Sequence, residues 1–185
     1  MISHRTKRCI WFACVALGVV AFAAIFALTV QGPQESASLS GFFEQKLTPV
    51  ETAAGGSIWM TIKATIRKVA SHLFAVAGIR KWAHTAEFFA LGLFVSLAAL
   101  LYVPRSDSSP LKPRKRLSHR ATVALAICVA CSLFDQIHKL FVLGRHFDVT
   151  DLLFDALGYG LALALVFIPA ALLMAHRGKR GAHFG

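Results

Sequence analysis

Four long apolar stretches dominate this 185-residue chain. They cover approximately residues 10–30, 82–102, 121–143 and 151–174. A membrane-spanning helix needs about 20 predominantly apolar residues, and each stretch has that length. Hydrophobic residues make up 56% of the chain, which is typical of a small polytopic membrane protein. We therefore expect an all-α fold, with residues 1–185 forming a single membrane domain built as a bundle of four transmembrane helices.

Residues 58–77 differ from these stretches. Their apolar positions recur at helical spacing, whereas Lys63, Arg67 and Lys68 occupy much of the opposite face. Such a pattern is typical of an amphipathic helix that lies in the membrane interface, here on the outer surface. A helix that packs across the mouth of the bundle is an equally good interpretation.

Lysine and arginine flank the apolar stretches and give the chain a net charge of +11. The loop between the second and third stretches carries a dense group of them: Lys112, Arg114, Lys115, Arg116 and Arg120. Cytoplasmic loops carry an excess of such residues, so we predict that this loop and both termini lie in the cytoplasm. Anionic lipid explains these charges better than nucleic acid does, and we expect no nucleic-acid partner.

Ionisable side chains interrupt the last three apolar stretches, or lie at their edge, near the predicted outer face. They form three pairs, whose members lie three or four residues apart, and each pair therefore shares one helix face. At about 1.5 Å per residue, the three deepest carboxylates lie roughly 6–12 Å inside the membrane, with Asp135 the deepest. Charged groups in hydrocarbon are costly and usually face the bundle interior, pair with one another or line a path. With an arginine at the rim, the candidate outer-leaflet site consists of His84, Glu87, Asp135, His138, Arg145, Asp151 and Asp155.

Several roles are open for this layer. The charges can neutralise one another and fix the helix register, or they can bind a lipid headgroup or a proton. A divalent metal is a third interpretation, because His84, Glu87, Asp135 and His138 are spaced as in carboxylate–histidine motifs of metal-binding bundles. These motifs are too short to specify a metal, so we expect no cofactor, and catalysis is left open. A proton path is the weakest interpretation, because the inner half of the stretches has no comparable string of acids.

Two motifs in this region resemble those of VanZ-like membrane proteins. Residues 81–89 resemble the family element Lys-x-x-His-x-x-Glu-Tyr/Phe. Residues 134–139 and 144–158 resemble Asp-Glu-x-x-Gln, then Gly-Arg, a short linker and Asp-x-x-x-Asn-x-x-Gly. Three positions depart from this pattern: Gln136 replaces Glu, Lys139 replaces Gln and Asp155 replaces Asn. The departures change the charge balance of the candidate site.

The resemblance implies a bacterial inner-membrane protein of the cell envelope. The family is named for a protein linked to resistance to teicoplanin, a lipoglycopeptide that acts at the cell surface. On this basis we expect the chain to bind or modulate membrane lipids or lipid-linked cell-wall intermediates at its outer-leaflet site. The alternative is a metal-dependent membrane enzyme that acts on a lipid headgroup.

Overall fold

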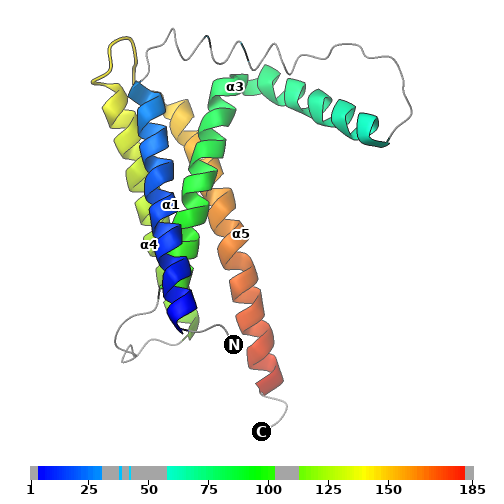
Figure 1. The fold of residues 1–185 in the computed structure, drawn as a ribbon, viewed down its shortest axis with the longest axis vertical. Coiled ribbons are helices and arrows are strands. Elements are labelled where there is room, and N and C mark those ends of the chain that lie inside the picture. The colour runs from blue at the N-terminus through cyan, green and yellow to red at the C-terminus, as the bar shows by residue number, and fades with distance from the viewer. Residues whose placement is uncertain (1–3, 31–37, 39–41, 43–57, 103–112, 182–185) are drawn as a thin grey trace.

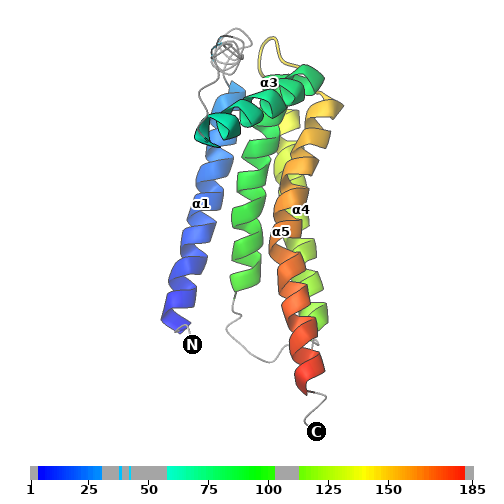
Figure 2. The same cartoon turned by 90° about the vertical axis from the view of Figure 1, so that its right-hand side faces the viewer.

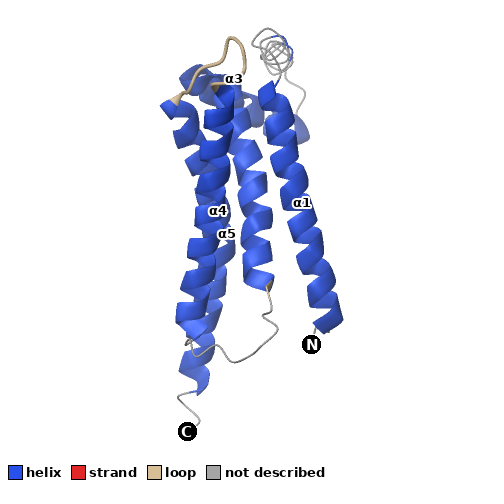
Figure 3. Ribbon diagram, turned by 90° about the vertical axis from the view of Figure 1, so that its left-hand side faces the viewer, coloured by secondary structure: helices blue, strands red, loops and turns tan. Residues whose placement is uncertain are grey.

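The chain forms a bundle of long helices. The computed structural model describes residues 4–30, 38, 42, 58–102 and 113–181. Its long helices are α1 (His4–Val30), α3 (Ile58–Leu101), α4 (Pro113–Lys139) and α5 (Val149–Gly181) (Figure 1). Each contains a segment long and apolar enough to cross a membrane, and the described part of the chain contains no strand (Figure 3). The predicted all-α bundle of four membrane-spanning helices is confirmed.

The bundle has two distinct ends, which the views in Figures 1 and 2 both show. At the turn end, residues 140–148 connect α4 to α5. At the terminal end, α1 begins and α5 ends, so the two chain termini lie on the same side. This agrees with the even number of predicted spans. The cytoplasmic location of the terminal end stays a prediction.

Helix α3 changes direction at Gly78, whose backbone has a φ of 70° and a ψ of 151°. Glycine adopts positive φ readily because it lacks a Cβ atom. Residues 58–77 run crosswise to the bundle at its turn end, whereas the rest of α3 runs down the bundle (Figures 1 and 2). The structure therefore contains a helix where the amphipathic segment was predicted. Its location in the membrane interface stays a prediction.

The third span was predicted to reach about residue 143, whereas the helix α4 ends four residues earlier, at Lys139. The amides of residues 140–142 bond to carbonyl groups three residues back, which tightens the last turn. Gly144 follows with a φ of 79°. Apolar residues continue past the end of the helix, and the sequence-based prediction therefore placed that end too late. Asp135 accordingly lies one turn from the end of α4, roughly 6 Å at 1.5 Å per residue, rather than 12 Å.

Two helices are longer than the apolar stretches predicted: α1 begins earlier, at His4, and α5 ends later, at Gly181. The added residues include Lys and Arg, which are good helix formers. Tail residues adjoining the apolar stretches are therefore helical as well.

Two glycines allow α3 and α5 to approach closely, and these helices form the most extensive contact in the bundle. A Cβ atom added at Gly158 would lie 2.3 Å from the carbonyl oxygen of Thr85, and one at Gly92 would lie 2.9 Å from the Cα of Tyr159. Small residues permit such close backbone contact in membranes. A buried apolar cluster packs beside this contact: Ile25, Phe88, Leu91, Cys128 and Tyr159.

We predict that Gly158→Ala destabilises the bundle, because the new methyl group must displace the backbone of α3. Overpacking of this kind costs about 1–3 kcal/mol. Gly160→Ala is the matched control, since an added Cβ there meets no atom within 4 Å. Thermal unfolding in detergent measures both. Equal melting temperatures for the two variants would contradict the described packing of α3 on α5.

Candidate functional site

A group of ionisable side chains from three helices meets at the turn end of the bundle. The close contact at Gly92 and Gly158 places the face of α3 that carries His84 and Glu87 against α5. Helix α4 packs on both α3 and α5. Three carboxylates are almost completely shielded from solvent, and Glu87 is 25% exposed. We call this group the acidic cluster; it consists of His84, Glu87, Asp135, Lys139, Asp151 and Asp155.

The ammonium group of Lys139 is the centre of the acidic cluster. Lys139 is 1% exposed, which is unusual for a lysine. Its Nζ atom lies 3.2 Å from Oδ2 of Asp135, one helical turn earlier on α4, and 3.1 Å from Oδ2 of Asp151 on α5. The same atom lies 3.4 Å from Nε2 of His84 on α3. A single cation thus connects all three helices.

The imidazole of His84 lies between two acidic groups of α5. Its Nδ1 atom is 3.4 Å from Oδ1 of Asp155 on α5 and 3.9 Å from Oε2 of Glu87, three residues later on α3. Its Nε2 atom is 3.8 Å from Oδ2 of Asp151. Because either ring nitrogen can carry a proton, His84 can donate to one carboxylate while its other nitrogen faces Lys139.

Two hydroxyl groups complete the contacts of the buried carboxylates. Ser132 of α4 donates a hydrogen bond of 2.8 Å to Oδ2 of Asp155. Thr29 of α1 donates to Oδ1 of Asp135, so the fourth helix also contacts the cluster. Hydrogen bonds of this kind partly replace the water that a buried carboxylate loses.

Polar atoms without a partner remain around the cluster. Oδ1 of Asp151, Nε2 of Gln136 and Nδ1 of His138 are buried and have no hydrogen-bond partner among the described residues. Buried polar groups are normally hydrogen-bonded, so each of these atoms can take a hydrogen-bond partner from a ligand. The cluster also has more acidic than basic side chains. It can therefore accept additional hydrogen-bond donors or positive charge.

Basic side chains form the rim between the acidic cluster and the surface. Arg80 is about half exposed, and its Nη2 atom lies 3.6 Å from Oδ2 of Asp151. Lys81 donates to the hydroxyl of Thr150. Arg145 donates to the carbonyl oxygen of Leu28 at 3.4 Å. Burial, followed by repulsion from Arg80, lowers the pKa of Arg145.

Asp148 fixes the start of α5, and with it the positions of Asp151 and Asp155. Its carboxylate accepts hydrogen bonds from both the hydroxyl and the amide of Thr150, each 2.8 Å long, as a helix N-cap does. These bonds hold the pKa of Asp148 below its usual range. The backbone amide of Asp148 in turn donates to Oε1 of Gln136 at 3.4 Å, which ties the cap to α4.

The structure does not place all predicted site residues together. It joins five of them in the acidic cluster: His84, Glu87, Asp135, Asp151 and Asp155. Arg145 lies at the rim, and the ring of His138 instead faces Phe26 of α1, with ring centres 4.2 Å apart. The residues that could hold a metal differ as well. Ligand atoms of His84, Asp135 and Asp155 lie within 4.8 Å of one another, whereas Glu87 and His138 of the predicted set are not part of that group.

Sequence reasoning missed Lys139 as a site residue. It named this lysine only as a departure from the family pattern that changes the charge balance of the candidate site. The spacing of four residues from Asp135, a typical helical ion pair, was the signal that could have found it. Thr29 and Ser132 gave no such signal, because small hydroxyl residues are common in membrane helices.

The family model of VanZ/LLP1 matches residues 12–173, which include the whole acidic cluster. Searches of the curated proteins and of the solved structures gave no match.

We predict that Lys139→Met strongly destabilises the fold, because it leaves buried carboxylates without their cation. Removing one partner of a buried ion pair costs about 3–5 kcal/mol. Lys115→Met is the control, since this lysine is exposed near the start of α4; its effect should stay within about 0.5 kcal/mol. Denaturant unfolding in detergent measures both variants. A similar small change for both would show that Lys139 is not paired as described.

Proposed function

The chain belongs to the VanZ/LLP1 family, and we propose that it binds the polar headgroup of a lipid or lipid-linked cell-envelope component at the acidic cluster. In this proposal the chain is a multi-pass protein of the bacterial inner membrane, with its turn end toward the outer leaflet.

The contact between Arg80 and Asp151 carries this proposal. Asp151 is completely buried, whereas the side chain of Arg80 is 49% exposed and lies 3.6 Å away. The acidic cluster is therefore connected to the surface through a cation that a ligand can reach. A cluster that served only to fix helix register would not need this connection.

The charges define the class of ligand. Arginine binds phosphate oxygens well, and Arg80 and Arg145 are both at the rim, with Lys81 beside them. Below them, the free Oδ1 of Asp151 can accept a hydrogen bond. A headgroup that combines a phosphate with a hydroxyl or ammonium group can contact both the basic rim and the acidic cluster, which a phosphate alone cannot do.

We expect Arg80→Ala and Arg145→Ala each to reduce the retention of phosphatidylglycerol, which has a phosphate and hydroxyl groups, by about fivefold, the contribution of one basic residue near a membrane surface. Native mass spectrometry of the purified full chain measures the number of bound lipids. Arg114→Ala at the terminal end is the control, because this exposed residue is far from the cluster. Unchanged lipid retention in both rim variants would overturn the proposal.

A metal-dependent enzyme acting on a lipid headgroup is the second candidate function. It is favoured by the ligand atoms of His84, Asp135 and Asp155, which lie within 4.8 Å of one another. A divalent ion there would polarise a phosphoryl oxygen or activate a water molecule. The ammonium of Lys139 contacts His84 and Asp135, two of these three groups, and so competes with any metal.

This competition makes the second candidate testable. Lys139→Gln should bind Zn²⁺ more tightly than the unaltered chain, and Lys139→Gln with Asp155→Asn should lose that binding. Titration calorimetry with Zn²⁺, together with metal analysis of the purified protein, measures both. No Zn²⁺ binding by either the unaltered chain or Lys139→Gln would exclude the metal-dependent enzyme.

A further inference from the structure

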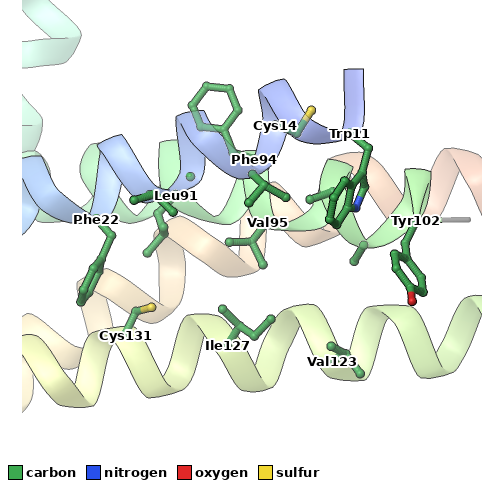
Figure 4. Close-up of a pocket in the computed structure, with 15 residues that line it drawn as sticks. Trp11, Cys14, Phe22, Leu91, Phe94, Val95, Tyr102, Val123, Ile127 and Cys131 are labelled. Carbon is green, nitrogen blue, oxygen red and sulfur yellow. The ribbon is translucent and has the colours of Figure 1, made fainter. Parts of the chain in front are cut away.

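A second feature lies between α1 and α4, toward the terminal end of the bundle. There the two helices separate and leave a cavity of about 520 Å³ with α3 as its floor (Figure 4). Trp11 and Tyr102 lie at one end of this cavity, and Phe22 and Cys131 lie at the other. We call it the apolar crevice, and its lining is almost entirely hydrocarbon.

Side-chain size explains where the crevice begins and ends. Toward the turn end, aromatic rings fill the seam between α1 and α4: Phe134 lies against Phe22 and Phe26, with ring centres 5.8 and 6.1 Å apart. Toward the terminal end, α1 instead presents Cys14 and Gly18. A Cβ atom added at Gly18 would lie 3.7 Å from the Cβ of Phe94, an ordinary van der Waals contact, so α1 presents only small side chains to this part of the crevice.

The dimensions of the crevice match a hydrocarbon chain. From Trp11 to Phe22 it runs roughly 16 Å along α1, at about 1.5 Å per residue, so its mean cross-section is about 30 Å². A helix with its side chains is about 10 Å wide, which corresponds to about 80 Å². A transmembrane helix from a second copy or a partner is therefore too wide to enter the crevice as a whole. An apolar site of this kind also stays dry, so a lipid acyl chain is the occupant that fits.

The mouth of the crevice is basic. Arg8 lies one helical turn before Trp11 on α1, and Arg120 lies one turn before Val123 on α4, so each continues the face that lines the crevice. The guanidinium of Arg120 donates to the carbonyl oxygens of Leu100 and Tyr102, 2.6 Å each, which fixes its position beside the end of α3.

No acidic side chain offsets these cations among the described residues of the terminal end. The described carboxylates all belong to the turn end: Glu87, Asp135, Asp148, Asp151 and Asp155. The mouth of the crevice therefore attracts anions. This charge complementarity selects among lipids, since a neutral headgroup would gain little from the mouth.

We propose that the apolar crevice binds one acyl chain of an anionic phospholipid, whose phosphate lies beside Arg8 and Arg120. The site is separate from the acidic cluster and uses the other leaflet. The bound chain restores packing where α1 and α4 do not meet, so the lipid acts as a structural ligand of the bundle.

Trp11 provides a local probe of this site. In the full chain with Trp59→Phe and Trp82→Phe, Trp11 is the remaining tryptophan. The protein is reconstituted in phosphatidylcholine vesicles that contain small amounts of acyl-brominated phosphatidylglycerol or acyl-brominated phosphatidylcholine. Bromine quenches a tryptophan that it contacts. We expect phosphatidylglycerol to quench Trp11 with an apparent affinity at least about fivefold higher, the selectivity that one basic residue provides.

Two leucine variants separate the crevice from the general lipid surface. Gly18→Leu places a side chain in the crevice and should abolish the preference for phosphatidylglycerol. Gly160→Leu is the control, because Gly160 is exposed on α5 and has open space around it; it should keep the preference. Arg8→Gln should weaken the preference without preventing quenching.

Three results would overturn the proposal. Equal quenching by the two brominated lipids in the unaltered crevice would show that the headgroup is not selected. A preference that persists in Gly18→Leu would place the lipid elsewhere. Shielding of Trp11 from both lipids, together with a dimer in native mass spectrometry that Gly18→Leu disrupts, would identify a second copy of the chain as the occupant.

Discussion

The buried ammonium group of Lys139 is the interaction on which the turn end depends. Placing several carboxylates inside a membrane bundle is costly, and their mutual repulsion would separate α4 from α5. Lys139 counters both effects, because it lies 3.2 Å from Asp135 and 3.1 Å from Asp151. Lys139 is also the last residue of α4, so these ion pairs lie at the level where α4 ends. The N-cap of α5 and the contacts of Thr29 and His84 lie close to that level.

Much of this arrangement could be predicted from the sequence. The apolar stretches predicted the membrane-spanning helices. One polar layer was indicated by the shared helix faces of His84 with Glu87 and of Asp151 with Asp155. The rest depends on side-chain geometry that a linear pattern does not contain. The apolar run after Lys139 hid the end of α4, and no spacing rule shows that His138 turns toward Phe26. Lys139 and Asp155 replace neutral residues of the family pattern, so this chain contains two opposite charges that the pattern lacks.

The bundle is chemically asymmetric along its length. Its turn end combines buried carboxylates with a basic rim, whereas the described part of its terminal end is basic and lies beside an apolar crevice. The close contact of α3 with α5 at Gly92 and Gly158 contributes to both features. It brings the carboxylates of the turn end together, and it leaves α1 and α4 to close the other side. Aromatic rings fill the seam between α1 and α4 only in the half of the bundle nearer the acidic cluster. Membrane lipid is thus the expected partner at both ends, through phosphate recognition at one and acyl-chain packing at the other.

The ion pair of Lys139 on α4 with Asp151 on α5 couples the two helices directly. A double-mutant cycle with Lys139→Met and Asp151→Asn, measured by reversible unfolding in detergent, tests this most directly. We expect a coupling free energy of about 1–3 kcal/mol, with the double variant more stable than the two single effects imply. Additive effects, within about 0.5 kcal/mol, would mean that the two groups do not interact and that the acidic cluster is not formed as described.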